Sequence, residues 1–271
     1  MHKSLIAFAA LASLAAVPAF AADMAVKAPM PAPAPVASWT GFYVGGNVGY
    51  LIEHDSSGFT NFTQPGAPLT NPAPNTASAT SFTGGGQVGF NWQFSPRWVA
   101  GVEGDWDWTN PKYNFCRATD SDGAAECSDT GRGFLTFSQK TDWLATARGR
   151  LGWLVFDNVL FYGTGGAAWG KVDTTLTASC AVDGCGNSGS TNITSASFSN
   201  TRSGWVAGAG VEGMLSQNWF ARLEWLHYDL GTLNNTFVSS PAVGSYGVVD
   251  SRRLQYDAVR FGLDYRFSWM Q

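Results

Sequence analysis

The chain has few charged residues for its length. Charged side chains make up 13% of its 271 residues, which is about half the share usual in globular domains. Acidic residues outnumber basic ones by 20 to 16, so the chain lacks the excess of positive charge that favours binding to nucleic acid. We therefore expect no nucleic-acid partner.

Long apolar runs are also missing beyond residue 21. No later stretch reaches the roughly 18–20 continuous apolar residues of a membrane helix. If the mature protein crosses a membrane, it must do so as a closed barrel, because only helices and barrels satisfy their backbone hydrogen bonds in lipid. The chain has instead 14% aromatic residues, 12 of them Trp, and 32 Gly. This composition indicates a strand-rich protein with a large apolar surface.

Histidine is scarce as well. The chain contains His2, His54 and His227. Nucleophilic catalysis needs a base within hydrogen-bond reach of its nucleophile, and no local serine motif accompanies the last two. The glycine runs at 84–86 and 163–166 lack the strand–loop–helix setting and the Lys-Ser/Thr ending of a phosphate loop. We therefore expect no catalytic residue, no cofactor and no metal site.

The N-terminus has the pattern of a secretion signal. Lys3 gives a positive start, residues 5–17 are apolar, and Ala19-Phe20-Ala21 forms an A-x-A cleavage site. This pattern predicts a signal peptide over residues 1–21. Residues 22–38 are rich in Ala and Pro, which stiffens the chain, and predict a periplasmic tether. Residues 39–271 form the predicted folded domain.

Four cysteines, Cys116, Cys127, Cys180 and Cys185, follow the predicted signal. An exported chain can form disulfides, and four cysteines allow three pairings. Proximity in the sequence favours Cys116–Cys127 and Cys180–Cys185. A zinc site is a weaker interpretation, because no histidine near these cysteines completes a ligand set.

Alternation of apolar and polar residues predicts eight β-strands. In 82–94, for example, Val88, Phe90 and Trp92 share one face, and Gln87 and Asn91 share the other. The predicted strands cover residues 40–52, 82–94, 97–108, 141–154, 158–170, 202–214, 218–229 and 255–267. The glycine-rich segment 158–170 leaves open which of its faces is the apolar one.

The connections between these strands alternate in length. Those near residues 95–96, 156–158 and 216–218 are short, whereas residues 53–81, 109–140, 171–201 and 230–254 are long and polar. Short turns on one side and long loops on the other are typical of outer-membrane barrels, and the strands are long enough to cross. The sequence thus predicts an all-β fold, an eight-stranded antiparallel transmembrane β-barrel with short periplasmic turns and four long extracellular loops.

The charged face of the strands decides which side meets lipid. An Arg on the lipid face at the midplane would cost about 2–4 kcal/mol, so we expect charged residues inside and aromatic residues outside. An expected ion-pair core consists of Glu103, Asp105, Asp107, Arg148, Arg150, Glu212, Arg222, Glu224, Arg260 and Asp264. We interpret it as a charge-neutralising core and not as an acid/base site. Eight strands leave an interior that side chains fill, which argues against a wide pore.

Several segments resemble one family. The stretch WTGFYVGGNVGY at 39–50, after an Ala/Pro-rich tether, is similar to the opening of the alphaproteobacterial outer-membrane immunogenic proteins. These belong to the opacity-type, porin-like superfamily of outer-membrane β-barrels. The resemblance continues in GGGQVGFNWQ at 84–93, VEGD at 102–105, YGTGGAAWG at 162–170, EWLHYDLG at 224–231 and RFGLDYRF at 260–267. The family usually ends at the aromatic residue of its last strand, whereas residues 268–271 follow Phe267 here.

The resemblance implies a Gram-negative surface antigen that stabilises the cell envelope and, in some members, contacts host cells. The expected partners are outer-membrane lipid or lipopolysaccharide, the barrel-assembly machinery during insertion, and a host or surface ligand at the loops. We expect a monomer in the cell outer membrane. Two alternatives stay open: an outer-membrane lipid-modifying enzyme and a narrow porin-like channel.

Overall fold

The computed structural model describes residues 38–64, 67–68, 78–118, 134–180, 192–238 and 247–267. The predicted signal peptide, residues 22–37 of the predicted tether, and residues 268–271 lie outside these ranges. Within the described ranges, no helix is long and apolar enough to cross a membrane.

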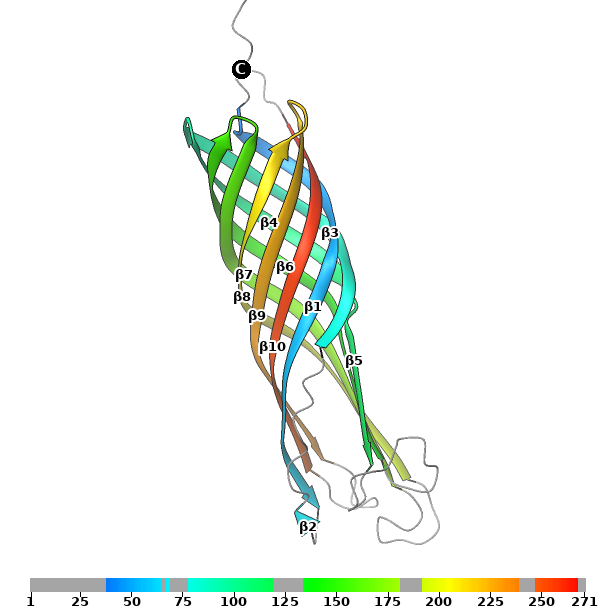
Figure 1. Ribbon diagram of the computed structural model, residues 1–271. Helices are drawn as coiled ribbons and strands as arrows, with labels where there is room; N and C mark the ends of the chain where they lie inside the picture. The colour runs from blue at the N-terminus through cyan, green and yellow to red at the C-terminus, as the bar shows by residue number, and fades with distance from the viewer. Residues whose placement is uncertain are drawn as a thin grey trace, which may run out of the picture. The chain divides into compact units, whose positions relative to one another are not determined.

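The described residues form one antiparallel sheet. Its elements are β1 (Gly41–Gln64), β2 (Ala67–Pro68), β3 (Ser78–Ser95), β4 (Trp98–Thr109), β5 (Lys112–Ala118), β6 (Phe134–Phe156), β7 (Val159–Cys180), β8 (Asn192–Met214), β9 (Trp219–Val238) and β10 (Gly247–Arg266). The strand order is β1-β3-β4-β6-β7-β8-β9-β10, and β10 pairs back with β1 to close a barrel (Figure 1). Eight strands of the described chain make up this ring, while β2 pairs with β1 and β5 with β6. The predicted antiparallel β-barrel is confirmed.

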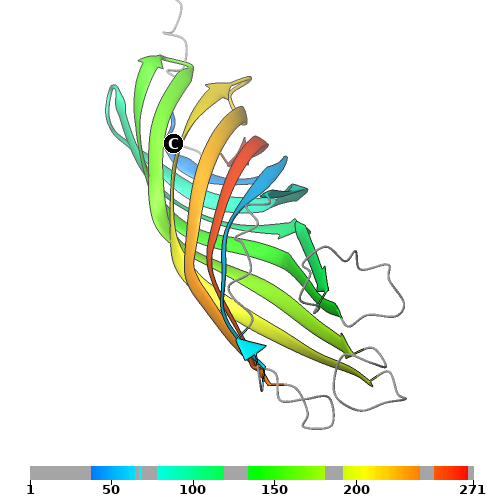
Figure 2. The same ribbon diagram turned by 60° about the horizontal axis from the view of Figure 1, so that its bottom comes forward.

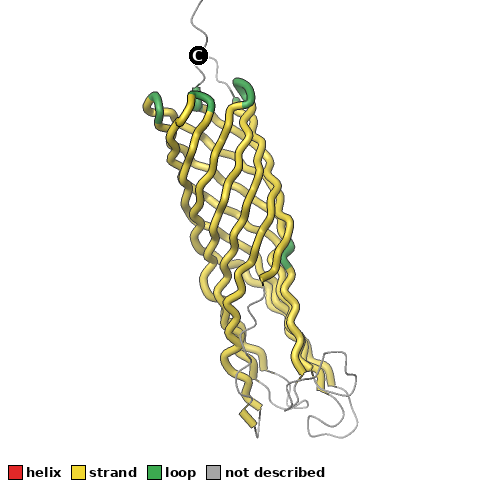
Figure 3. Tube along the Cα trace, viewed as in Figure 1, coloured by secondary structure: helices red, strands yellow, loops and turns green. Residues whose placement is uncertain are grey.

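The strands extend further than predicted at one end of the barrel. β6 has 23 residues and β7 has 22, about twice the 9–11 residues that a crossing requires. The prediction that residues 53–81, 109–140, 171–201 and 230–254 are loops throughout is therefore wrong. Strand pairing continues into each of these segments (Figure 3), because the bilayer sets a minimum length for a strand and no maximum.

Beyond the barrel the strands divide into two arms. The pairing of β8 with β9 runs from Met214–Phe220 to Trp205–Asp229. After that point, β8 continues beside β7, and β9 continues beside β10. We call the ends of β1, β9 and β10, together with β2, the first arm, and β5 with the ends of β6, β7 and β8 the second arm. Both extend from the same end of the barrel (Figures 1 and 2).

The outer wall of the barrel is apolar. Mid-strand residues such as Val88 and Val102 are each 63% exposed. One aromatic belt lies toward the arms and consists of Trp106, Trp108, Trp169, Trp205 and Trp225. A second lies toward the short turns and consists of Trp92, Trp98, Trp153 and Trp219. An apolar band between two aromatic belts is the surface that a lipid bilayer requires.

The strand whose parity the sequence left open, β7, follows the same rule. Leu160 and Tyr162 are buried inside, and Phe161 and Trp169 are exposed on the outer wall. Even-numbered residues of β7 therefore face the interior. The outer wall of β7 includes glycines such as Gly165, which have no side chain.

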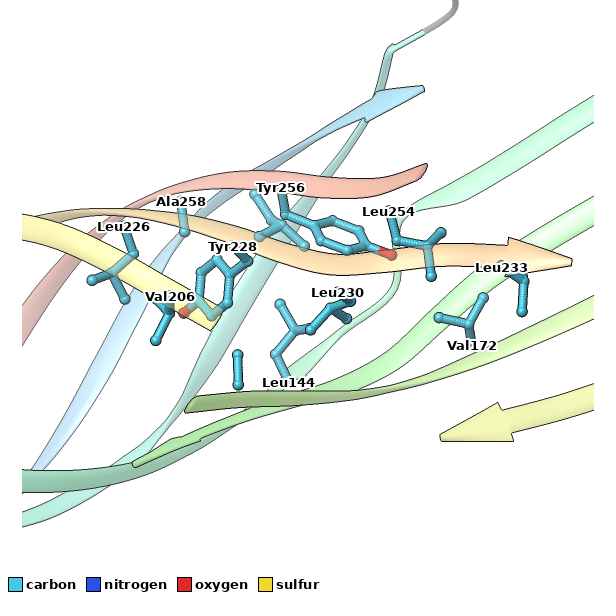
Figure 4. Close-up of a cluster of buried hydrophobic side chains, with 12 residues drawn as sticks. Leu144, Val172, Val206, Leu226, Tyr228, Leu230, Leu233, Leu254, Tyr256 and Ala258 are labelled. Atoms are coloured by element: carbon cyan, nitrogen blue, oxygen red, sulfur yellow. The ribbon is translucent and has the colours of Figure 1, made fainter. Parts of the chain in front are cut away.

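Two apolar layers lie inside the barrel, one on each side of the charged residues. The layer toward the turns packs Trp39 with Val99, Leu154, Leu160, Tyr162 and Phe220. The indole nitrogen of Trp39 donates to the backbone oxygen of Asp157 at 3.2 Å. The layer toward the arms includes Leu144, Leu226, Tyr228, Leu230 and Tyr256 (Figure 4). The sequence predicted the ion pairs of the interior but not these two apolar layers. Alternation shows which residues face inward, but not where along a strand the inward residues change from charged to apolar.

In the arms, apolar side chains lie on the inward face of the strands, as in a water-soluble sheet. Tyr113, Phe137 and Leu176 of the second arm pack against Phe237 of the first and against Ala79. The Arg252 guanidinium of the first arm lies 4.2 Å from the centre of the Phe137 ring. A sheet with one buried face and one solvated face is stable in water, and this buried face explains why the strands continue beyond the bilayer.

Candidate functional site

The ten residues of the expected ion-pair core all face the barrel interior. They come from β4, β6, β8, β9 and β10, and each is 1–6% exposed. Glycine provides room for them: a Cβ atom at Gly45 would lie 1.9 Å from Asp264 Oδ1, and one at Gly85 would lie 2.3 Å from Asp107 Oδ1. The structure thus brings all ten side chains into one region of the barrel.

Glu103 is the centre of this network. Its carboxylate accepts hydrogen bonds from the guanidiniums of Arg148 and Arg222 and from the hydroxyl of Tyr43. Arg150 lies 3.6 Å from the same carboxylate. Bonds between ionised partners are about twice as strong as neutral ones, so Glu103 ties four strands together.

Toward the arms, two arginines share their carboxylates. Arg148 reaches Asp105 at 2.8 Å and Glu224 at 3.0 Å. Arg260 reaches the same two carboxylates at 3.2 Å and 2.7 Å, and it also pairs with Asp107. Each of these guanidiniums therefore satisfies more than one buried carboxylate, as a buried charge requires.

Toward the turns, the network continues through separate pairs. Arg222 Nε donates to Asp264 at 2.6 Å, and Arg150 pairs with Glu212. Gln87 donates to Asp264 at 2.8 Å, which connects this side of the network to a neutral side chain.

Two amides complete the network that charge alone predicted. Asn47 donates to Gln87 at 2.8 Å and to Asp107 at 2.9 Å. Alternation places Gln87 on the polar face of its strand, and an amide at such an inward position is the signal that could have included both residues. The side chains of the paired arginines and carboxylates are 0–4% exposed. The arrangement can neutralise charge and fix the positions of the strands.

A second cluster lies on the outer wall. His54 Nε2 is 2.5 Å from Asp257 Oδ2, and His227 Nδ1 is 2.9 Å from Asp257 Oδ1. The sequence does not indicate this contact, because His54 and Asp257 are 203 positions apart. Only the register of β1, β10 and β9 brings them together, and no local pattern announces it.

Lysines and aspartates form a third cluster beyond the arm-side belt on β6 and β7. Asp142 is 2.9 Å from Lys140 and 3.0 Å from Lys171, and Asp173 is 3.5 Å from both lysines. The hydrogen bond from Lys140 lowers the pKa of Asp142 from its ordinary 3.8 to about 2. Asp142 therefore keeps its negative charge throughout the physiological pH range.

Other predicted features fall outside what the structure describes. Cys127 and Cys185, and the side chains of Cys116 and Cys180, lie outside the described residues, so the disulfide pairing stays a prediction. In the described part of the chain, no group of three or more His, Cys, Asp or Glu side chains is arranged to hold a metal ion.

Comparison with known proteins identifies the family of the chain. The family described as outer membrane protein beta-barrel domain matches residues 7–267. The 31 kDa outer-membrane immunogenic proteins of Brucella melitensis biotype 1 and Brucella suis biovar 1 are each 32% identical over 98% of this chain and 100% of their own length. Among solved structures, the attachment invasion locus protein Ail of Yersinia pestis is 14% identical, with a TM-score of 0.39 over 84% of this chain and 99% of its own. The chain therefore belongs to the family of outer-membrane β-barrel proteins that includes these immunogenic surface proteins.

Proposed function

We propose that this outer-membrane protein is a structural barrel without catalytic activity, which stabilises the envelope and presents its two arms to surface or host partners. The observation that carries the proposal is the filled interior. A charged network lies between two apolar layers, so the interior is built for rigidity. The same interior argues against the narrow channel that the sequence left open.

The arms support the second part of the proposal. They hold paired strands beyond the arm-side aromatic belt, and Phe137, Phe237 and Arg252 join one arm to the other. A rigid base of this kind reduces the ordering cost of binding at its tip. The segments 119–133 and 181–191 connect strands of the second arm and are the natural places for such contacts.

A deletion strain tests both parts. It is complemented with the full chain or with a variant that lacks residues 119–133, and gel mobility of unheated samples verifies folding of each. We expect both chains to restore resistance to detergent and only the full chain to restore surface binding. Normal detergent resistance in the deletion strain would contradict the structural role.

Planar-bilayer recording tests the channel. We expect no conductance steps from the purified protein, because three layers of side chains fill the barrel. Reproducible steps from correctly folded protein would favour the channel.

One observation favours the lipid-modifying enzyme as a second candidate. The His54–Asp257–His227 cluster places two imidazoles beside a carboxylate near the lipid surface, which resembles the base and its orienting partner in hydrolases. Both imidazoles bond to Asp257, and among the described residues neither bonds to a hydroxyl group. We expect the lipid A profile of a His54→Ala/His227→Ala strain to equal that of the wild type, and an altered profile would support the enzyme.

Assembly follows from the same proposal. We propose that the barrel inserts through the barrel-assembly machinery and remains monomeric. The outward row Phe261, Leu263 and Phe267 gives β10, the strand that closes the ring on β1, an apolar outer face for that machinery. Depletion of the machinery should leave the protein unfolded in the periplasm, and insertion at the normal rate would refute this route.

A further inference from the structure

The His54–Asp257–His227 cluster occupies a defined level of the outer wall. Asp257 lies between Tyr256 and Ala258, which are 0% and 1% exposed, and Glu53, which precedes His54, is buried as well. The side chains of His54, Asp257 and His227 are 50%, 25% and 27% exposed. All three therefore point outward, away from the barrel interior.

The cluster lies at the edge of the apolar band that is nearer the arms. On β10, the outward residues Val259, Phe261 and Leu263 follow Asp257 in the chain and continue toward the short turns, and all three are exposed apolar side chains. On β9, Trp225 precedes His227, and the His227 ring centre is 5.5 Å from that of Trp205. Tryptophans of such a belt sit at the level of the lipid headgroups. The imidazoles are thus placed where the phosphate groups of the outer leaflet lie.

The hydrogen bonds to Asp257 determine which nitrogen of each imidazole ring carries a hydrogen. An ionised carboxylate can only accept, so His54 Nε2 and His227 Nδ1 must each carry a hydrogen and donate it to Asp257. In a neutral imidazole the second ring nitrogen is an acceptor, and in the charged form it becomes a donor. Histidine is the side chain that ordinarily changes charge between about pH 5 and 8. Protonation of both rings would add two charges and two hydrogen-bond donors to this part of the wall.

The net charge of this part of the wall depends on the two histidines, because the other charged groups nearby balance each other. On β10, Arg253 faces outward beyond the cluster, and its Nε donates to Asp229 of β9 at 3.1 Å. That pair is balanced, so the described groups give −1 with both imidazoles neutral and +1 with both protonated. On β1, Glu53 faces the interior, as does Tyr256 of β10. On β8, Trp205 is the neighbour.

We propose that His54, Asp257 and His227 form a pH-dependent contact for the phosphate groups of outer-leaflet lipids. The cluster binds these groups in mild acid and does not bind them at neutral pH. Asp257 holds both imidazoles in place in either state. The negative cluster repels phosphate at neutral pH, whereas the positive cluster attracts it and offers two N–H donors. The contact would fix β1, β10 and β9 to the surrounding lipid in an acidic environment. This inference does not depend on the proposed structural or surface-binding role.

Lipid retention by the full mature barrel tests the proposal. The probe is phosphatidylglycerol, whose single negative charge is the same at pH 5.5 and 7.5, compared with zwitterionic phosphatidylcholine. Native mass spectrometry from detergent micelles counts the protein molecules that keep a lipid. Exposed charge pairs are individually weak, so we expect about three- to fivefold more phosphatidylglycerol at pH 5.5 than at 7.5, and no change for phosphatidylcholine.

Two variants identify the groups responsible. His54→Gln/His227→Gln keeps amide donors for Asp257 but cannot take up protons, and we expect it to lose the rise at pH 5.5. Lys140→Ala/Lys171→Ala removes cations of the third cluster, and we expect it to keep the rise. Gel mobility of unheated samples verifies folding of both. Equal retention at the two pH values in the wild type would overturn the proposal without any variant, as would a rise that survives the glutamine substitutions.

Discussion

Glu103→Gln is the sharpest perturbation of the charged interior. The substitution preserves size but replaces an acceptor with an amide whose nitrogen is a donor, opposite Arg148, Arg222 and the Tyr43 hydroxyl. Removing one partner of a buried ion pair costs about 3–5 kcal/mol. Arg148 keeps Asp105 at 2.8 Å and Arg222 keeps its own second carboxylate, so we expect the lower end of that range.

A loss of about 3 kcal/mol lowers the equilibrium constant for folding by roughly a hundredfold. Urea unfolding in phospholipid vesicles, followed by the gel mobility of unheated samples, measures this difference. The control is Val102→Leu on the adjacent residue, which is 63% exposed on the outer wall and should change stability by at most about 0.5 kcal/mol. If Glu103→Gln were as stable as this control, the charged network would not hold the barrel together.

Three further predictions concern the wall and the arms. Gly166→Ala should sharply reduce the folded yield, because its Cβ would lie 2.0 Å from a backbone oxygen. The control Gly165→Ala lies on the outer face, where the nearest atom is 3.5 Å away, and should fold normally. Equal yields of the two variants would contradict the register. Val88→Arg at the middle of the apolar band should destabilise the barrel by about 2–4 kcal/mol in bilayers, and a neutral effect in the urea titration would place this face in water. Lys140 lowers the pKa of Asp142 to about 2, so the contribution of Asp142 to stability is present above about pH 4 and is lost as the pH falls toward 2. Asp142→Asn should remove this loss of stability in acid. An unchanged dependence of stability on pH in the variant would refute the prediction.

The outward and inward faces of the barrel strands could be predicted from the sequence. Period-two alternation identified the wall, as in Val88 and Phe90 against Gln87 and Asn91, and the charged residues fixed its inward face. Alternation places Glu103 and Arg148 on the same inward face, whereas their position opposite each other depends on the register of β4 and β6. The expectations failed where a residue's role depends on depth along the strand, because Leu144 and Leu226 lie on the same inward face as the charges.

The arms and the outer cluster could not be predicted for a different reason. Polar, glycine- and serine-rich segments have the composition of loops, yet Phe137, Leu176 and Phe237 give them a common buried face that appears only after folding. His54 and Asp257 meet through the register of the first and last strands, which no local segment specifies. Contacts that close a barrel are the most distant in sequence and the least visible in it.

The orientation of the tryptophans tests the central claim most directly. Nine of them, Trp92, Trp98, Trp106, Trp108, Trp153, Trp169, Trp205, Trp219 and Trp225, are 38–67% exposed on the outer wall, whereas Trp39 is buried inside. In bilayers of lipids brominated on their acyl chains, we predict that most of the tryptophan emission is quenched and that aqueous iodide has little effect. Strong quenching by iodide with little effect of bromine would show that the aromatic face meets water, and would contradict the inverted barrel.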